Sequence, residues 1–372
     1  MPRALTVMQV LPALGTGGVE RSTLEIAAAL VAAGHRSLVV SAGGDRVAEL
    51  ERGGSTHVTL DLGRKSLATL LQVRALRRLL ARERPDIVHV RSRLPAWLVW
   101  WARRGLRASK PAVVSTIHGL NSPGRYSAIL TYGERVICVS DTVRTHVLRH
   151  YPGCDPRRLR VIRRGIDPAQ FPRGLRPDAQ WRETFLADHP RLAGGTLLTL
   201  PGRGTRLKGH HDALQLIARL RKDGRDVRGL LLGVAEPGRE RYVAELSALA
   251  GELGIADAVV LSPPRRDVRE VLAISALVLQ LSNKPEAFGR TVAEALSLGR
   301  PVLGWDHGGV GDVLAAHFPA GRVPPADIDA LARRAAALLD APPSVPPYTG
   351  TTLAAMQAAT LALYAEVTDA RG

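Results

Sequence analysis

Two glutamates eight positions apart, Glu286 and Glu294, flank a predicted helix start in the stretch NKPEAFGRTVAEALSLGRPVLGWDHGGVGDV, residues 283–313. The free N–H groups at that start, near Gly289 and Arg290, are typical of a phosphate site. A carboxylate is a poor phosphate ligand but accepts hydrogen bonds from two sugar hydroxyls. The spacing therefore favours a ligand with sugars on both sides of a phosphate, such as a nucleotide sugar. The alternative is that Glu286 only stabilises the helix dipole and Glu294 is a surface residue, so that neither binds a ligand.

A glycine-rich loop, LPGRGTRLKG, contributes two cations, Arg203 and Lys208. It follows a predicted strand and precedes a predicted helix, a place where two cations are suited to clamp a phosphate. On its own the loop fits a solvated turn equally well. His118, in STIHG, follows another predicted strand, and both a catalytic and a structural histidine fit that position.

The first predicted strand ends in GTGGVE, residues 15–20, and a helix begins at once. Gly17 and Gly18 allow a ligand to approach the backbone closely, and the helix start attracts anions. A dinucleotide fingerprint GxGxxG would need a glycine where Glu20 stands, and the second strand lacks the terminal acid that binds a ribose. A nicotinamide-dependent oxidoreductase is therefore disfavoured, whereas a tight turn without a ligand stays open.

Short apolar runs alternate with helical patterns along the chain, which predicts strands buried in parallel sheets. In the first half we expect strands at 5–11, 37–42, 57–62, 86–90, 112–117 and 135–140. After a Pro- and Arg-rich interval, 151–178, we expect strands at 195–203, 227–235, 258–263, 277–282 and 301–305. The fold class is therefore α/β, with two Rossmann-like, doubly wound domains facing across a cleft where such folds bind ligands.

The charge of the chain is unevenly placed. Residues 1–164 hold 27 basic and 11 acidic side chains, which accounts for nearly all of the net charge of +17. No metal-ligating pattern accompanies the two cysteines, so no metal is expected. The absence of a long apolar segment and of a signal-peptide pattern favours a cytoplasmic protein. Nucleic-acid binding would fit the charge, but no RNA- or DNA-binding signature appears and the paired glutamates would be unexplained.

A tryptophan- and arginine-rich stretch, LPAWLVWWARRGLRASK, lies within the basic half. Its candidate patch residues are Trp97, Trp100, Trp101, Arg103, Arg104 and Arg107. Tryptophan beside arginine suits the interface of an anionic membrane or an acidic acceptor. The alternative is that the tryptophans pack on the sheet and the arginines form a solvated face.

Six motifs in order, GGVER, TIHG, VIRRGID, GRGTRLKG, EAFGRTVAEALSLGRPVLG and GGVGDV, resemble those of glycosyltransferase family 4, which has the GT-B fold. They cover nearly the whole chain, and the nearest likeness is to the bacterial branch that builds lipopolysaccharide core or other surface glycans. The chain departs from the family pattern at three places. Arg163–Arg164 stand where Pro-Asn is frequent, Ala287 replaces a frequent glycine, and Asp312 replaces a glutamate.

The resemblance implies a role for each candidate residue. Gly17 and Gly18 would border the donor diphosphate and the acceptor. His118 would lie near the donor sugar and the reacting carbon, and Arg203 and Lys208 would neutralise the leaving pyrophosphate. Glu286 would bind donor-sugar hydroxyls, the backbone of Phe288, Gly289 and Arg290 would contact sugar and phosphates, and Glu294 would bind the ribose.

The resemblance also implies the reaction. We expect a retaining, metal-independent transfer of a hexose or N-acetylhexosamine from a nucleotide sugar, UDP above other nucleotides, to a lipopolysaccharide-core or other lipid-linked acceptor. A soluble small-molecule acceptor is the alternative. The expected domains are an acceptor-binding domain at 1–170, a nucleotide-sugar domain at 171–348, and a terminal helix at 349–372 that packs on the first. The expected location is the cytoplasm, and the alternative is peripheral attachment to the inner face of the cytoplasmic membrane.

Overall fold

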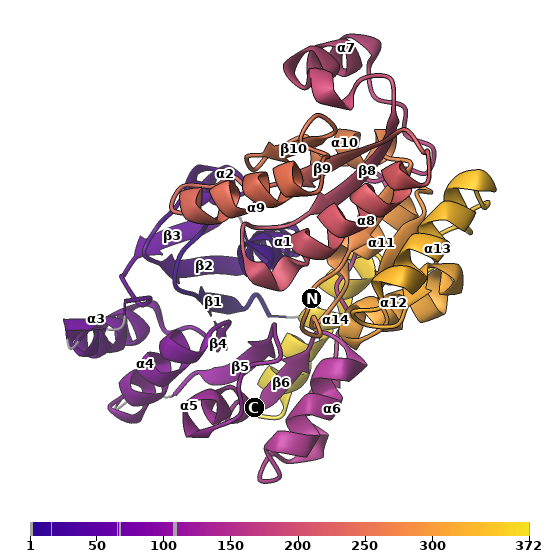
Figure 1. Ribbon diagram of the computed structural model, residues 1–372. Helices are drawn as coiled ribbons and strands as arrows, with labels where there is room; N and C mark the ends of the chain where they lie inside the picture. The colour runs from indigo at the N-terminus through magenta and orange to yellow at the C-terminus, as the bar shows by residue number, and fades with distance from the viewer. Residues whose placement is uncertain (1–2, 16, 65, 67, 107–109, 372) are drawn as a thin grey trace. The chain divides into compact units, whose positions relative to one another are not determined.

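The computed structural model of the chain describes residues 3–15, 17–64, 66, 68–106 and 110–371 (Figure 1). These residues form two compact units. The first contains residues up to Gly165 together with the C-terminal segment that begins at Leu353, and the second runs from Ile166 to Thr352. Each unit is built on one parallel sheet, as the buried apolar runs predicted.

The first unit has a seven-stranded sheet in the order β3-β2-β1-β4-β5-β6-β7. Its strands are β1 (Thr6–Val10), β2 (Arg36–Ser41), β3 (Thr56–Thr59), β4 (Ile87–Val90), β5 (Ala112–Ile117), β6 (Arg135–Cys138) and β7 (Leu159–Val161). Its helices are α1 (Gly18–Ala32), α2 (Val47–Arg52), α3 (Ala68–Glu83), α4 (Arg93–Arg104), α5 (Arg125–Ala128), α6 (Asp141–His150) and α14 (Leu353–Asp369). Strand β7 was not predicted, because it is three residues long and lies within the Pro- and Arg-rich interval.

Helix α14 belongs to the core of this first unit. Its buried residues Met356, Leu363 and Tyr364 form one apolar cluster with α1 and with strands β1, β4, β5 and β6. In Figure 1 the helix, drawn in yellow, lies beside β5 and β6. The last segment of the chain therefore completes a unit that begins about 350 residues earlier.

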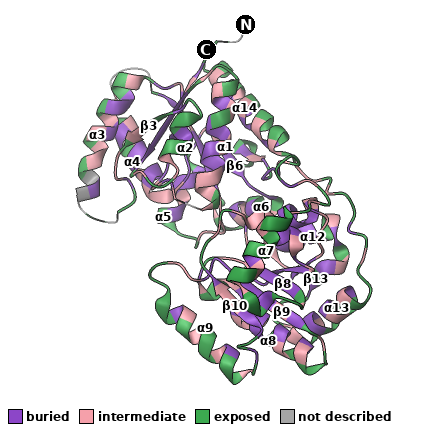
Figure 2. Cartoon of the chain, turned by 90° about the horizontal axis from the view of Figure 1, so that it is seen from above, coloured by how far each residue is buried: buried purple, intermediate pink, exposed green. Residues whose placement is uncertain are grey.

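The second unit has a six-stranded sheet in the order β10-β9-β8-β11-β12-β13. Its strands are β8 (Thr196–Pro201), β9 (Val227–Leu232), β10 (Val259–Ser262), β11 (Leu277–Gln280), β12 (Val302–Trp305) and β13 (Arg322–Val323). Its helices are α7 (Ala179–Asp188), α8 (His210–Lys222), α9 (Glu240–Glu252), α10 (Val268–Ile274), α11 (Arg290–Ser297), α12 (Gly308–His317) and α13 (Ile328–Asp340). Figure 2 shows the strands as buried, whereas helices such as α9 carry exposed residues on their outer turns.

Strand order determines which loops become neighbours. The order in which strands are added to the sheet reverses between β1 and β4 in the first unit and between β8 and β11 in the second. Loops that leave the carboxyl ends of such strand pairs diverge, and ligands bind between them. The predicted candidates Arg203 and Lys208 follow β8, and Glu286 follows β11. Among the described residues, no helix is long and apolar enough to cross a membrane.

Candidate active site

The carboxylate of Glu286 is held by three side chains of the second unit. Its Oε1 accepts hydrogen bonds from Lys208 Nζ at 2.6 Å, from Gln280 Nε2 at 2.8 Å, and from the Ser282 hydroxyl. Gln280 and Ser282 are buried at the end of β11, and the main-chain carbonyl of Ser282 in turn lies 2.8 Å from His307 Nε2. A carboxylate held this way is oriented before a ligand arrives, which favours a binding role.

Lys208 is placed by the loop between β8 and α8. A single turn of 3-10 helix, Arg206–Lys208, is followed by Gly209 in the left-handed conformation (φ 73°), which starts α8. A Cβ at Gly209 would lie 1.8 Å from the carbonyl oxygen of Leu281, so only glycine brings this loop against the end of β11. Arg203, in the same loop, is exposed and pairs with no carboxylate among the described residues.

Gly308 and Gly309, near the end of the sequence motif, pack against the main chain of the loop that carries Glu286. Gly308 has φ 56°, and Gly309 donates its N–H to the Glu286 carbonyl at 2.8 Å. A Cβ at Gly309 would lie 2.5 Å from Phe288 Cα, and one at Gly308 would lie 2.7 Å from the Glu286 oxygen. Close contact with main-chain atoms therefore accounts for glycine at both positions.

Helix α11 begins after Gly289, as the sequence predicted, and no side chain caps it. The start of a helix attracts anions through its dipole and its first amide groups. Glu294 is 6 % exposed, and its Oε1 accepts from Arg290 Nε at 3.2 Å one turn earlier. The structure therefore places Glu286 and Glu294 on either side of one helix start, with Arg290 beside the second glutamate.

In the first unit, His118 follows β5 and contacts Arg164. Arg164 Nη2 donates to His118 Nδ1 at 2.5 Å, and the other ring nitrogen, Nε2, is buried without a hydrogen-bond partner in the described chain. Burial lowers the pKa of His118 well below its usual value, and the charges of Arg164 and Arg91 lower it further. His118 is consequently neutral near pH 7.

The start of α1 lies at Gly17 and Gly18. A Cβ at Gly17 would meet Glu20 Oε2 at 2.3 Å, so the carboxylate of Glu20 turns back over the first turn of the helix. A Cβ at Gly18 would meet nothing within 4 Å, and this residue is exposed. Since Glu20 is flexible at its carboxylate end, packing in the described chain requires glycine at neither position.

The tryptophan and arginine stretch forms α4 and its end. The ring of Trp97 contacts Trp100 (centroids 5.6 Å apart) and Trp101 (5.5 Å), and the guanidinium of Arg104 lies 4.3 Å from the Trp100 centroid. Trp101 is 37 % exposed, whereas Trp97 and Trp100 are half-buried. We call Trp97, Trp100, Trp101 and Arg104 the α4 cluster.

The two remaining residues of the predicted patch differ from this cluster. Arg103 donates to the Pro111 carbonyl at 2.8 Å and pairs with Glu134 at 3.0 Å. It therefore anchors the helix rather than offering a free charge. Arg107 lies outside the described residues.

Three residues of these networks were not predicted from the sequence: Gln280, Ser282 and Arg91. Gln280 is a polar residue in an otherwise apolar strand, LVLQLS, and that interruption was the available signal. Arg91 is buried after β4 and donates to Gln9 Oε1 at 2.8 Å and to Ser22 at 3.3 Å. Burial lowers its pKa to about 10, which still leaves it charged at neutral pH.

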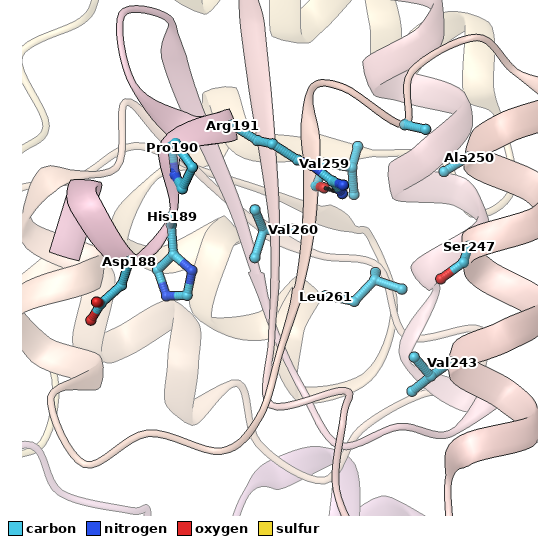
Figure 3. Close-up of a pocket in the computed structure, with 11 residues that line it drawn as sticks. Asp188, His189, Pro190, Arg191, Val243, Ser247, Ala250, Val259, Val260 and Leu261 are labelled. Atoms are coloured by element: carbon cyan, nitrogen blue, oxygen red, sulfur yellow. Dashed lines mark hydrogen bonds between the residues drawn. The ribbon is translucent and has the colours of Figure 1, made fainter.

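A cavity of about 410 Å³ in the second unit lies apart from the predicted site residues. It is lined by β10, by α9 and by the segment from Asp188 to Arg191 (Figure 3). None of the predicted residues is among its lining. Arg191 reaches into this region and approaches the Val259 carbonyl at 3.5 Å. No group of three or more metal-ligating side chains is found within the described ranges, and metal independence stays a prediction.

Family models match most of the chain. "Glycosyltransferase Family 4" matches residues 16–170, and "Glycosyl transferases group 1" matches residues 182–346. The chain belongs to glycosyltransferase family 4. The predicted family and the predicted GT-B fold are thus confirmed, and the motifs around Glu286 and His118 fall inside the matched residues.

Solved structures of similar fold cover this family 4 chain almost completely. A glycosyltransferase from Rickettsia africae has a TM-score of 0.83 at 25 % identity, with 98 % of each chain covered. HepE from Anabaena, solved with UDP and glucose, has a TM-score of 0.81 at 19 % identity, with 97 % of this chain and 99 % of HepE covered.

Curated relatives match a shorter part. The D-inositol 3-phosphate glycosyltransferase of Gordonia bronchialis is 34 % identical over 194 residues, which are 50 % of this chain and 40 % of that protein. The match thus spans less than half the length of this relative.

Proposed function

We propose that the chain is a retaining glycosyltransferase that moves a hexose or N-acetylhexosamine from a UDP sugar to a glycan acceptor. The observation that carries the proposal is the arrangement around α11. An oriented carboxylate, Glu286, and a second carboxylate, Glu294, flank an uncapped helix start, and Lys208 lies beside the first. A nucleotide sugar has the matching order of sugar, diphosphate and ribose.

In this proposal Glu286 binds hydroxyls of the donor sugar, and Glu294 binds the ribose. Arg203, Lys208 and the first amides of α11, at Gly289 and Arg290, bind the diphosphate. Lys208 and Glu286 are in contact, which agrees with Lys208 binding the phosphate and Glu286 binding the sugar. In a nucleotide sugar these two parts are adjacent, because the anomeric carbon is bonded to a phosphate oxygen. The choice of UDP is supported by HepE, which was solved with UDP and glucose.

The proposed reaction proceeds on one face of the donor sugar. The bond from the anomeric carbon to the diphosphate oxygen breaks, and the acceptor hydroxyl oxygen forms the new bond to that carbon. The hydroxyl proton passes to the leaving phosphate oxygen. Negative charge develops on the diphosphate, where Arg203, Lys208 and the α11 amides would stabilise it. No metal is required in this scheme.

A donor screen tests the proposal. The full chain is mixed with UDP, GDP and ADP sugars, and thermal shift and donor hydrolysis are measured. Stabilisation by a UDP sugar that disappears in Glu286→Ala supports the assignment, with Glu252→Ala as an exposed control. Equal response of wild type and Glu286→Ala would reject it. Activity that survives excess chelator supports metal independence, whereas loss restored by a divalent ion would refute it.

For the acceptor we propose a lipid-linked glycan of the lipopolysaccharide-core or surface-glycan type. The α4 cluster supports this class. It combines an exposed tryptophan, Trp101, with an arginine, Arg104, that lies over Trp100, and both residue types suit an anionic lipid surface. The alternative acceptor is a soluble small molecule, as the name of the Gordonia relative indicates for that protein. Salt-sensitive binding to anionic liposomes, weakened in Trp101→Ala, supports the lipid-linked class. No binding at low salt would favour the soluble one.

A further inference from the structure

His118 has two ring nitrogens in different environments, and their difference limits what the ring can do. Nδ1 faces the guanidinium of Arg164, which has only donors and no lone pair to offer. Nδ1 must therefore be the unprotonated nitrogen that accepts. In the neutral ring the proton then lies on Nε2, which is buried and has no partner among the described residues.

Neighbouring positive charges also favour the neutral form of the His118 ring. If His118 were protonated, an N–H would point at the Arg164 guanidinium, and two positive charges would meet in a buried place. Arg91 and His89 are the other titratable groups that act on the ring, and both also disfavour its charged form. The imidazolium is therefore suppressed by geometry as well as by burial.

Arg164 is itself held firmly. It is 8 % exposed, and its Nη1 donates to the Ser22 hydroxyl in α1 at 2.6 Å. Met356 of α14 contacts the same nitrogen at 3.9 Å and accepts from the neighbouring Gly165 N–H at 3.4 Å. Two helices thus fix the guanidinium that faces His118. This residue is also one of the three departures from the family pattern, where a neutral asparagine is frequent.

We propose that Arg164 is a positioning residue that fixes His118 as a neutral hydrogen-bond donor at Nε2, so that His118 binds a substrate oxygen with a free lone pair. It follows that His118 does not remove the proton of the acceptor hydroxyl. A buried donor without a partner is destabilising, and a sugar or phosphate oxygen would satisfy it. The substrate part of this inference rests on the proposed transferase function.

The tautomer is measured by NMR on the full chain labelled with ¹⁵N-histidine, with the His118 signals identified by their loss in His118→Asn. We expect the Nε2–H form in wild type, unchanged from pH 8 to pH 5.5. Arg164→Met should mix the tautomers and let the ring protonate at higher pH, whereas Arg164→Lys, which keeps one charged donor, should largely restore the wild-type signals. Arg163→Met, at the exposed neighbour that pairs with Asp141, should change nothing.

An Nδ1–H tautomer in wild type, or titration near pH 6.5, would overturn the inference. The measurement needs no substrate, so its failure is separate from a failure of the proposed function. With a donor identified, Arg164→Met should also lower kcat/KM about tenfold or more, and Arg164→Lys should recover part of the loss. Full activity of Arg164→Met despite a changed tautomer would contradict the substrate contact.

Discussion

Lys208 and Glu286, 78 residues apart, form one charge-assisted hydrogen bond at 2.6 Å in the second unit. The bond joins the loops that follow β8 and β11, the two strands between which the sheet reverses its order. Gln280 and Ser282 donate to the same carboxylate oxygen, so the pair belongs to a network rather than to an isolated surface contact. Each residue therefore positions the other as well as any ligand.

The first prediction concerns this pair. Glu286→Gln and Lys208→Met should each lower transfer by about 10²–10³-fold, because each removes a charge proposed to act on the donor. The double variant should lose less than the product of the two, since residues in one network couple by about 0.5–3 kcal/mol. Both side chains are partly exposed, so unfolding free energies should change little. Initial rates and urea unfolding check both statements.

Exposed residues of the same types provide the controls for this cycle. Glu252→Gln and Lys222→Met remove the same groups from positions without an ion pair in the described chain, and they should leave transfer unchanged. If the two single variants retained wild-type rates, the assignment of the donor site would be wrong. Strictly multiplicative losses would instead show that the two residues act independently.

The second prediction separates packing from ligand contact at Gly18. Alanine is favoured over glycine in a helix by up to about 1 kcal/mol, and the Cβ at position 18 meets no described atom within 4 Å. Gly18→Ala should therefore keep or raise the free energy of unfolding. It should also lower the rate of transfer about tenfold, because we expect a substrate to lie in the open space beside Gly18.

Gly251→Ala is the matched control for Gly18→Ala, because Gly251 is also helical and also faces open space. It should stabilise the chain without affecting transfer. Equal activity of Gly18→Ala and wild type would show that no ligand approaches that position. A lower free energy of unfolding in Gly18→Ala would contradict the open space around position 18.

The third prediction concerns the glycine pair beneath Glu286. In Gly309→Ala the new methyl group would lie 2.5 Å from Phe288 Cα and 2.7 Å from the Ala287 oxygen, both main-chain atoms that cannot move alone. Overpacking of this kind costs about 1–3 kcal/mol. We expect that loss in urea unfolding, together with weaker donor binding because the Glu286 loop shifts. An unchanged unfolding midpoint would contradict the close contact.

The scaffold was predictable because its strands are short, uncharged apolar runs, and such runs have few alternatives to a sheet buried on both faces. The start of α11 was likewise predicted, because Gly289 and Gly299 mark both ends of that helix. The lipopolysaccharide branch, the acceptor and the individual site roles stay predictions.

Contacts between segments that are distant in the sequence could not be predicted. The state of His118 depends on Arg164, 46 residues later, and the orientation of Glu286 depends on Lys208, 78 residues earlier. A local pattern reports propensity and burial, but it contains no distance between strand ends. Strand β7 was missed for a related reason: its three residues are stabilised by pairing with β6 rather than by their own apolar character.

The last prediction uses pH to test the loop that holds Lys208. His210, the first residue of α8, is fully buried, and burial lowers its pKa from 6.5 to about 4. In the unfolded chain the same ring takes up a proton near pH 6.5. The unfolded state therefore binds more protons than the folded state between pH 6.5 and about 4, and the free energy of unfolding must fall as the pH is lowered through that window.

For His210 the full loss is about 3 kcal/mol, at about 1.4 kcal/mol for each pH unit, and it levels off below about pH 4, where the folded state is protonated as well. His89 and His118, whose pKa values are also lowered by burial, should add to the slope. His210→Asn should make the pH dependence shallower even if it lowers stability overall. Urea unfolding at several pH values measures this. A His210→Asn slope equal to that of wild type would mean that this ring is not buried in the neutral form beside Lys208.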